Sequence, residues 1–526
     1  MKLRLKWFCG FLAAGVACSP TLSQAGPRED LERLRNQCLY FAAGRAPNDS
    51  NTVTIRHGLY AQSPFSAPGE VDLAASAFSL AALPAATDNG IVTSNAAYQI
   101  AADAAREVRR MITKSAAATK PDEIERYGYG GMLSHYPVWN ESAGEFQAQH
   151  GVEFSSIDTT LLLYGLLVNA EYFGGSVRED YETARNGIRW SDWLDRATAG
   201  HRNQFHMAYR PGHGFFAWWD WYSQETMLLT LFAGMSDPGM DLPAVWRAWN
   251  RAPRTYTSPE PGAKTYSCLA TWFGDPFTVI YGLAFLDFAH FPADLDGQNW
   301  FKEGQTAYFA DIEYCRRERG YLDGLCAGFS ICSPNGIQGK PSGAVGEPVS
   351  RTDATIYTVA GGLQYYACDP AANPIAVALS GLLNDTPGFL PWHGWPAATV
   401  NATTAGHPVL CDRIIGQDIS FVGLAVDNFL THRTPNLVLR DAAMRRALAR
   451  VFPPRVVSTD KSEDGESVFH CRGIPFSVAK LERTEMSGSG WSAVDQVRFD
   501  AEGLSSVRQA RSGGQREYRL SAEPEM

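Results

Sequence analysis

Hydrophobic residues recur at three- and four-residue spacing through most of the chain between residues 72 and 451, and the segments that carry this pattern end at Gly or Pro. The pattern predicts helices. Several of these helices are apolar on more than one face, which suits an inner layer wrapped by an outer layer. The predicted helices read IDTTLLLYGLLVNAEYF, QETMLLTLFA, DLPAVWRAWNRA, PFTVIYGLAFLDFAHF, NWFKEGQTAYFADIEYC, DATIYTVAGGLQYYA, PIAVALSGLLN and QDISFVGLAVDNFLTH.

A series of helical hairpins in one domain indicates an all-α fold in which paired helices close into a toroid. In such a toroid the inner helices all run the same way, so their N-termini meet at one rim. Long loops rich in Gly, Pro and aromatic residues separate the helices, as at 332–351 and 386–412. Loops of that length are usually functional or disordered, and these contain too many Trp and Phe residues for plain disorder.

The pattern changes near the C-terminus. Ser- and Gly-rich stretches such as STDKSEDGES and SGSG follow Pro454, with short β-like pieces at SVFHC and SAVDQVRFD. We interpret residues 456–526 as a small β appendage or a partly disordered tail. The helical domain is then expected to span residues 26–455.

The N-terminus has the features of a secretory signal peptide. Basic residues precede the short apolar run WFCGFLAAGVAC, and the small-residue sequence SQA ends at Ala25. We therefore expect residues 1–25 to be removed and the protein to be periplasmic or secreted. Lipidation at Cys18 is the alternative. The apolar run is too short to span a membrane, and in an oxidising compartment some of the eight remaining cysteines are expected to pair.

Composition narrows the class of partner. The 526-residue chain has a net charge of −10, which argues against nucleic acid or an anionic membrane as the ligand, because no basic excess exists to release counterions. The sequence contains no CxxC pair and no HExxH motif, so we expect neither a metal nor another cofactor. A neutral substrate fits this composition best, and the oligomeric state stays open.

Four carboxylates share one setting in the predicted fold. Glu153, Glu225, Asp353 and Asp418 lie at or just before the starts of predicted helices. Acids there can simply cap amides and oppose the helix dipole, for about 0.3–1 kcal/mol each. If the helices form the inner layer of a toroid, however, the four acids gather at one rim. Glycoside hydrolysis needs two such carboxyl groups, one as acid and one to activate water.

An aromatic cluster precedes one of these acids. The stretch GHGFFAWWDWYSQETMLLTLFAG contains Trp218, Trp219 and Tyr222 shortly before Glu225. These rings are candidates for stacking on sugar faces, and core packing is the alternative. A helix N-terminus lowers the pKa of a Glu, so the rings or a nearby carboxylate would have to desolvate Glu225 if it acts as a general acid.

Several motifs resemble the bacterial glycoamylase-like family, which includes endo-β-1,2-glucanases and is related to the transglycosylase domain of cyclic β-1,2-glucan synthases. EFSSIDTTLLLYG resembles the family's E-x-S-x-I-D-T-A-L-L segment, and WYSQETMLL resembles Y-[NS]-E-x-M-[IL]-L. AYFADIEYC, RTDATIYTVAGGL and GQDISFVGLAVDNFLTHRT follow in the family's order, over roughly residues 125–435. The resemblance implies an (α/α)6 toroid, in agreement with the helical pattern.

The resemblance also implies roles for individual residues. Glu225 falls on the family's general acid, and Asp418 is the candidate base, acting on water directly or through a relay. Glu153 and Asp353 fall on acids of the substrate site, and His135 falls where the family often has a His. The implied activity is that of an inverting β-glucan hydrolase of the endo-β-1,2-glucanase type, with an oligo- or polysaccharide substrate.

Departures from the family pattern keep other functions open. Gly282 and Leu283 replace a Ser-His pair, GFSICSPNG with Ser333 replaces a segment that contains an Asp, and residues 419–421 replace Q-G-P. A glycan-binding protein that has lost the chemistry, or a β-1,2-glucan transglycosylase, are therefore alternatives. A polysaccharide lyase is disfavoured, because it would need cations to neutralise a uronic acid and the predicted rim is rich in carboxylates.

Overall fold

In the computed structural model of the protein, the described residues are 26–48, 55–63, 66, 69–271, 276–325, 353–390, 394–396, 399–401, 403, 415–462, 466–485, 491–509 and 516–522. The predicted signal peptide, residues 1–25, lies outside these ranges and stays a prediction. None of the described helices is both long and apolar enough to cross a membrane.

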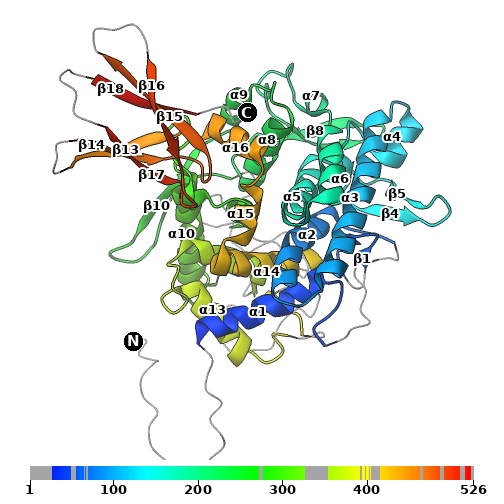
Figure 1. The fold of residues 1–526 in the computed structure, drawn as a ribbon. Coiled ribbons are helices and arrows are strands. Elements are labelled where there is room, and N and C mark those ends of the chain that lie inside the picture. The colour runs from blue at the N-terminus through cyan, green and yellow to red at the C-terminus, as the bar shows by residue number, and fades with distance from the viewer. Residues whose placement is uncertain are drawn as a thin grey trace, which may run out of the picture.

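A large helical domain forms most of the molecule (Figure 1). Its α-helices are α1 (Pro27–Ala42), α2 (Leu73–Asp88), α3 (Ser94–Ala117), α4 (Pro121–Tyr127), α5 (Ser156–Phe173), α6 (Gly175–Asn186), α7 (Trp190–Trp193), α8 (Gln224–Ser236), α9 (Leu242–Arg247), α10 (Trp300–Glu318), α12 (Ile356–Gly361), α13 (Pro374–Asp385), α14 (Gly416–Thr431), α15 (Arg433–Val438) and α16 (Ala442–Val451).

The helices form an inner and an outer layer, as their apolar patterns predict. Helices α2, α5, α8 and α14 are buried on nearly every face. In space α8 packs on α5, α5 on α2, α2 on α14, and α14 on α12. Helices α3, α6 and α16 are amphipathic and bury only one face. These buried helices therefore pack in a series, each against the next.

Polar caps fix where the inner helices begin. The side chains of Asp72, Ser155 and Ser223 accept hydrogen bonds from backbone amides in the first turns of α2, α5 and α8. Ser155 and Ser223 are thus the N-caps of α5 and α8. Glu225 and Asp418 lie in the first turns of α8 and α14, as expected from the sequence.

The all-α expectation holds only in part, because small sheets cover the domain. Within this domain, strands β3, β6, β7 and β8 form a four-stranded sheet, and the other strands pair as two-stranded hairpins or ribbons. The strands are β1 (Ile55–Arg56), β2 (Leu59–Tyr60), β3 (Leu133–Ser134), β4 (Pro137–Asn140), β5 (Glu145–Ala148), β6 (Phe154–Ser155), β7 (His206–Arg210), β8 (Gly214–Trp218), β9 (Pro253–Thr257), β10 (Thr265–Leu269), β11 (Asp353–Thr355) and β12 (Thr399–Asn401).

One predicted inner helix is replaced by three short 3-10 helices. These are η1 (Pro276–Val279), η2 (Tyr281–Ala284) and η3 (Phe288–His290). The amide of Gly282 donates to Oε1 of Gln224 at 2.8 Å, a partner on α8 rather than within the segment. A similar change affects the segment after Asp353, which begins as strand β11, so that α12 starts only at Ile356 and continues into η4 (Gly362–Tyr365).

A tight turn at Asp294 joins several elements. Asp294 is fully buried, and its Oδ2 accepts hydrogen bonds from the indole nitrogens of Trp246 and Trp300, both at 2.9 Å. Its Oδ1 accepts from the backbone amides of Asp296 and Gln298, also at 2.9 Å. Four donors therefore share one carboxylate, which fastens α9 and the start of α10 to this turn.

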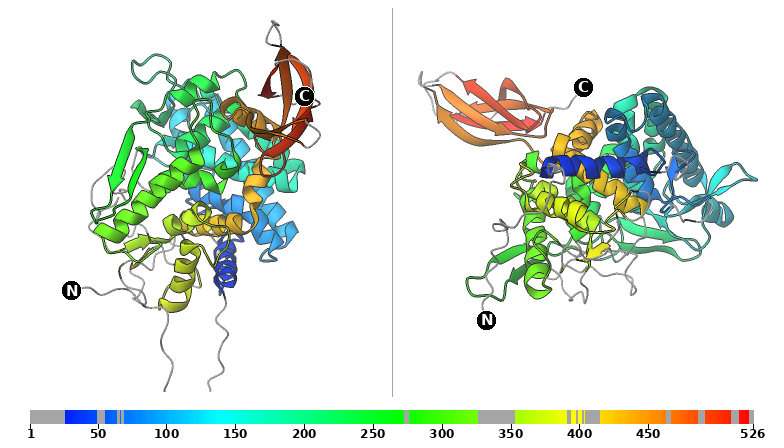
Figure 2. Two further views of the ribbon diagram at one scale, coloured as in Figure 1. Left: turned by 90° about the vertical axis from the view of Figure 1, so that its left-hand side faces the viewer. Right: turned by 90° about the horizontal axis from the view of Figure 1, so that it is seen from below.

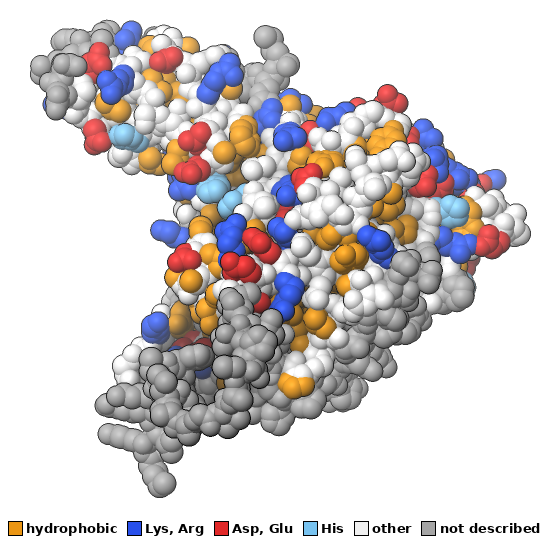
Figure 3. Space-filling model, turned by 60° about the horizontal axis from the view of Figure 1, so that its bottom comes forward, with side chains coloured by type: hydrophobic (Ala, Val, Ile, Leu, Met, Phe, Trp, Pro, Cys, Tyr) orange, Lys and Arg blue, Asp and Glu red, His pale blue; other side chains and the backbone are white. Residues whose placement is uncertain are grey.

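Residues beyond α16 form a β-sandwich. Strands β13 (Arg455–Lys461), β14 (Ser467–Arg472) and β17 (Leu504–Gln509) make one antiparallel sheet, and β15 (Val478–Glu485), β16 (Ser492–Arg498) and β18 (Arg516–Ala522) make the other. The two sheets enclose a small core of their own that includes Phe469, Leu481 and Val497. The sandwich projects from the helical domain (Figure 2), and Figure 3 shows it as a separate lobe with charges of both signs.

Five cysteines lie among the described residues, and none of them is in a disulfide. Cys38, Cys268, Cys315 and Cys471 are buried thiols, and Cys368 is exposed. The expected disulfides are therefore absent from the described part of the chain. Outside the predicted signal peptide, the other cysteines are Cys326, Cys332 and Cys411, which lie outside the described residues.

Candidate active site

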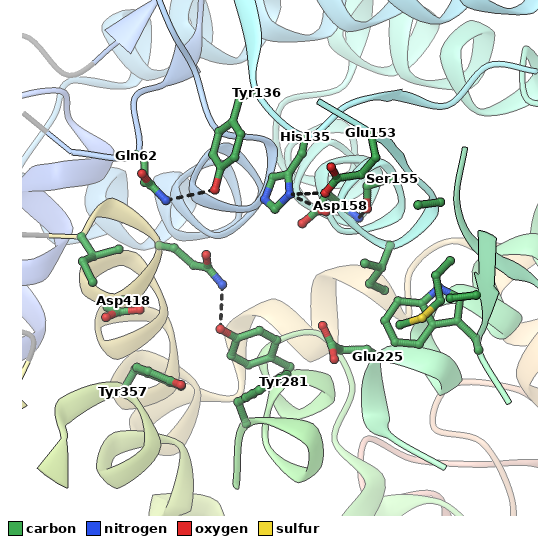
Figure 4. A pocket seen from close by; sticks show the side chains of 18 of the residues that line it. Gln62, His135, Tyr136, Glu153, Ser155, Asp158, Glu225, Tyr281, Tyr357 and Asp418 are labelled. Carbon is green, nitrogen blue, oxygen red and sulfur yellow. Dashed lines mark hydrogen bonds and ion pairs between the residues drawn. The ribbon is translucent and has the colours of Figure 1, made fainter. Parts of the chain in front are cut away.

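A cavity of about 500 Å³ opens where inner helices begin. Its wall combines the N-terminal turns of α5, α8 and α14 with residues of the loops and small sheets around them (Figure 4). The lining residues are Gln62, His135, Tyr136, Glu153, Ser155, Ile157, Asp158, Met207, Ala208, Phe216, Ala217, Trp219, Glu225, Phe277, Tyr281, Tyr357, Ile415, Gln417 and Asp418.

The two predicted catalytic carboxyls both line this cavity. Glu225 is 7% exposed and Asp418 is 6% exposed. Figure 4 shows them on different parts of the wall, with Tyr281 between them. Within the described residues, Oδ2 of Asp418 is buried and has no hydrogen-bond partner. Burial, and then the carboxylate of Asp72, raise the pKa of Asp418 well above its ordinary value.

His135 lies within a group of carboxylates at the cavity wall. Its Nδ1 is 3.6 Å from Oδ2 of Asp158 and 3.7 Å from Oε1 of Glu153. Burial by itself lowers the pKa of His135, but Asp158, Glu153 and Asp72 outweigh it and raise the pKa to about 9. The hydrogen bond from His135 in turn lowers the pKa of Glu153. His135 is therefore an imidazolium at neutral pH, and Glu153 is a carboxylate.

Polar side chains on the opposite walls complete the site. The Tyr136 ring stacks on His135 with 4.2 Å between centroids, and its hydroxyl accepts a hydrogen bond from Nε2 of Gln62 at 3.2 Å. Across the cavity, Nε2 of Gln417 donates to the Tyr281 hydroxyl at 2.6 Å. These side chains can donate to and accept from the hydroxyl groups of a neutral sugar.

Sequence reasoning missed several of these lining residues. They are Gln62, Tyr136, Asp158, Phe216, Tyr281, Tyr357 and Gln417. Two signals were available. Asp158 follows the cap Ser155 by three residues, and Tyr136 is adjacent to the predicted His135. The others come from segments far apart in the sequence, and only the fold brings them together.

The predicted aromatic residues separate into two groups. Trp219 lines the cavity, is 3% exposed, and donates from Nε1 to Oγ of Ser156 at 3.0 Å. Trp218 lies outside the lining, donates to Oδ2 of Asp195 at 3.0 Å, and stacks on His201 with 3.8 Å between centroids. These contacts are structural, and the predicted role of Trp218 at the substrate site stays a prediction.

Tyr222 is likewise a core residue rather than part of the cavity wall. Its side chain is fully buried and packs on the Trp300 ring, with 4.8 Å between centroids. Phe216, which the sequence analysis did not single out, is 40% exposed and lines the cavity. The residue after it, Ala217, has φ of 55°, a strained conformation for a residue other than glycine. This backbone conformation interrupts the regular alternation of side chains at the end of β8.

Four other positions were singled out from the sequence, and two of them are described in full. Asp353 belongs to strand β11, and its side chain lies outside the described residues. Leu283 is buried in the core, and a Cβ at Gly282 would lie 2.9 Å from atoms of Gln224 and Phe288. The positions where the family has Ser-His are thus packed and apolar in this chain. Ser333 is outside the described residues.

Within the described part of the chain, no three His, Cys, Asp or Glu side chains are grouped so as to hold a metal ion. At the turn that contains Asp294, for example, the carboxylate oxygens accept hydrogen bonds from N–H donors. The charges at the cavity come instead from side chains, with one imidazolium among several carboxyl groups.

Comparisons with known proteins relate the chain to solved structures. No protein-family model matches the sequence, and no curated protein matches it significantly. An endo-β-1,2-glucanase from Chitinophaga pinensis, solved with sophorotriose and glucose, has a TM-score of 0.58 at 13% identity, over 81% of this chain and 98% of that chain. A β-1,2-glucanase from Parabacteroides distasonis has 0.59 at 15% identity, over 81% of this chain and 60% of that chain.

A more distant structure shows the same similarity. An endo-β-1,2-glucanase from Talaromyces funiculosus, solved with sophorose, has a TM-score of 0.51 at 10% identity, over 82% of this chain and 92% of that chain. The chain therefore shares the fold of these glucanases. The predicted likeness to the glycoamylase-like family is confirmed at the level of the fold.

Proposed function

We propose that the protein is a glycoside hydrolase that cleaves a β-glucan internally at β-1,2 linkages with inversion of configuration. The observation that carries the proposal is that Glu225 and Asp418, from two different inner helices, both line the same cavity as buried carboxyl groups. Glycoside hydrolysis needs such a pair. The glucanases that share the fold support the choice of substrate.

In this proposal Glu225 protonates the leaving glycosidic oxygen while Asp418 removes a proton from water, directly or through a relay. Inversion requires room for that water, about 6.5–9.5 Å between carboxyl groups or a longer bridged gap. A base must first lose its own proton. Because the pKa of Asp418 is raised, it is a stronger base than an ordinary aspartate, at the cost of being protonated up to a higher pH.

The test is hydrolysis of a panel of soluble glucans that includes linear β-1,2-glucan. We expect cleavage of β-1,2-glucan to internal fragments, with the first-formed anomer in proton NMR opposite to that of the substrate. Glu225→Gln should abolish this cleavage but retain hydrolysis of a glycosyl fluoride, whose leaving group needs no acid. Asp418→Asn should lose both. Retained configuration would contradict inversion, and the reverse pattern of the two variants would exchange their roles.

A non-catalytic glycan-binding protein is the second candidate, favoured by the packed apolar residues Gly282 and Leu283 where the family has Ser-His. Calorimetry with β-1,2-glucan distinguishes the two, since binding by the wild type without any cleavage supports this candidate. Transglycosylation would instead give products longer than the substrate in mass spectra. We also propose a periplasmic or secreted location, which N-terminal sequencing of the mature protein checks by a start at Gly26.

A further inference from the structure

The hairpin of β7 and β8 carries an exposed aromatic ring at the cavity. Phe216 lies on β8, lines the cavity and is 40% exposed. Its cross-strand partner on β7 is Ala208, which also lines the cavity. Residues two apart along a strand share a face, so Arg210, the last residue of β7, belongs to the same face of the hairpin as Phe216. A ring and a guanidinium group are therefore neighbours beside the cavity.

Arg210 links this ring to a carboxylate of the cavity wall. Its Cζ is 5.2 Å from the centroid of the Phe216 ring, and its Nη2 is 3.8 Å from Oε2 of Glu153. Glu153 directly precedes β6, and the pairing of β6 with β7 brings it opposite Arg210. The side chains of Arg210 and Glu153 are 45% and 32% exposed, so both can be reached by a ligand.

The separation of Arg210 and Glu153 leaves both charged groups able to bond to a ligand. Hydrogen bonds of the N–H···O type span about 2.7–3.2 Å, and this pair is 3.8 Å apart. A carboxylate only accepts hydrogen bonds and a guanidinium only donates them. A sugar hydroxyl does both, so neighbouring hydroxyls of one ring can donate to Glu153 and accept from Arg210. The opposite charges of the pair cancel, which suits a neutral sugar better than a uronic acid.

The backbone directly after the ring has an uncommon conformation. Successive strand residues point to opposite faces, yet Phe216 and Ala217 both line the cavity. The φ of Ala217 is 55°, and strained backbone of this kind is concentrated at ligand-binding and active sites. The strain at Ala217 therefore accompanies the placement of two neighbouring residues on one wall of the cavity.

We propose that Phe216 and Arg210, together with Glu153, form a glucosyl-binding subsite at the rim of the cavity. A neutral sugar ring stacks on Phe216, and its hydroxyls bond to Arg210 and Glu153. This inference rests on the proposed function for the identity of the sugar. Aromatic side chains offer a large apolar area to a ligand, and a few polar groups around such an area fix its orientation. Phe216 and Arg210 thus contribute to affinity for the chain rather than to the chemical step.

The affinity for β-1,2-gluco-oligosaccharides of increasing length tests this subsite. Calorimetry uses the Glu225→Gln background, so that the ligand stays intact, and affinity should rise by one step for each further subsite that the chain reaches. We expect Arg210→Ala and Phe216→Ala each to lose one step and to bind the longest oligosaccharides about fivefold more weakly, the ratio that a typical hydrogen bond or a covered ring contributes. A series identical to that of the background protein would overturn the proposal.

The sandwich offers a matched control for both variants. The Cζ of Arg519 is 4.3 Å from the centroid of the Trp491 ring, and its Nε is 2.7 Å from Oε2 of Glu482. This group repeats the aromatic–Arg–Glu arrangement away from the cavity, so Arg519→Ala and Trp491→Ala should keep the full series. An equal loss in these controls would show that the effect does not arise at the cavity, and would contradict the proposal. Arg210→Lys keeps the charge without the planar guanidinium. It should bind with intermediate affinity, and it replaces Arg210→Ala if that variant does not fold.

Hydrolysis kinetics provide the second readout. With Glu225 in place, both variants should raise KM for long β-1,2-gluco-oligosaccharides about fivefold and keep kcat, because binding is lost equally in the ground state and the transition state. A lower kcat at unchanged KM would assign the pair to the chemical step and refute the subsite.

The outcomes separate this inference from the proposed function. If the wild type cleaves these oligosaccharides and both variants match it, the subsite alone fails. If the wild type binds them without cleavage, the proposed function fails, and the affinity series alone decides the subsite. If the wild type binds none of them, both are refuted.

Discussion

The charge on His135 should stabilise the folded protein in a pH-dependent way. Replacing it by Gln removes the cation that lies between the carboxylates of Glu153 and Asp158, at 3.7 and 3.6 Å from Nδ1. A pKa of about 9, against 6.5 for an ordinary histidine, corresponds to a contribution on the order of 3 kcal/mol, because one pKa unit is about 1.4 kcal/mol.

The way this stabilisation changes with pH follows from the difference between the folded and unfolded pKa values of His135. Because the folded pKa is raised above the unfolded value, the stabilisation is complete below pH 6.5, the ordinary histidine pKa, and is lost as pH rises through about 9. We expect urea unfolding to show His135→Gln less stable than the wild type by about 3 kcal/mol at pH 6, by the arithmetic above. The two proteins should converge near pH 10.

His150 provides a matched control for this experiment. It also pairs with a glutamate, at 2.8 Å from Glu125, but its side chain is 90% exposed. Exposed ion pairs contribute about 0–1 kcal/mol, so His150→Gln should have little effect at either pH. A deficit of His135→Gln that is equal at pH 6 and pH 10 would show that His135 contributes through packing rather than charge, and would refute the reasoning.

Three further predictions follow from other parts of the molecule. Asp294→Ala leaves four donors without an acceptor, at a cost of about 1–3 kcal/mol for each donor, and should lower the free energy of unfolding by at least about 4 kcal/mol. A loss under about 1 kcal/mol in urea unfolding would contradict this prediction. Phe216→Ala should weaken oligosaccharide binding about fivefold in calorimetry, because covering its 40% exposed ring contributes on the order of 1 kcal/mol. Val377→Ala, which removes an exposed side chain of α13, should leave binding unchanged. Leu481→Ala should destabilise the sandwich by about 2–5 kcal/mol without changing glucan binding, as limited proteolysis and calorimetry would show.

Local signals in the sequence were enough to predict three of the inner helices. Continuous apolar runs predicted the burial of α5, α8 and α14, and Ser155 and Ser223 cap two of these helices. The placement of Glu225 and Asp418 at one cavity followed from the idea that inner helices share a direction. These features depend on residues within one or two helical turns of each other.

Features that depend on distant residues were not predictable in the same way. The 3-10 helices near Gly282 replace an expected helix, and the Gly282 amide donates to Gln224 on another element. Phe216 lines the cavity and Trp218 does not, and the residue between them, Ala217, has a positive φ. An alanine in the sequence gives no signal of such a backbone conformation. The charge of His135 depends on carboxylates from two separate segments, Asp72 in one and Glu153 and Asp158 in the other.

The buried turn at Asp294 has a mechanical consequence. Arg455, at the start of the sandwich, donates to the Asp294 carbonyl, and Leu295 donates from its amide to the Val451 carbonyl at 2.9 Å. The carboxylate of Asp294 holds Trp300, which packs on Tyr222, three residues before Glu225. A tilt of the sandwich would therefore pull on the wall that carries Glu225. The start of the sandwich is thus connected through hydrogen bonds and ring packing to the helix that carries Glu225.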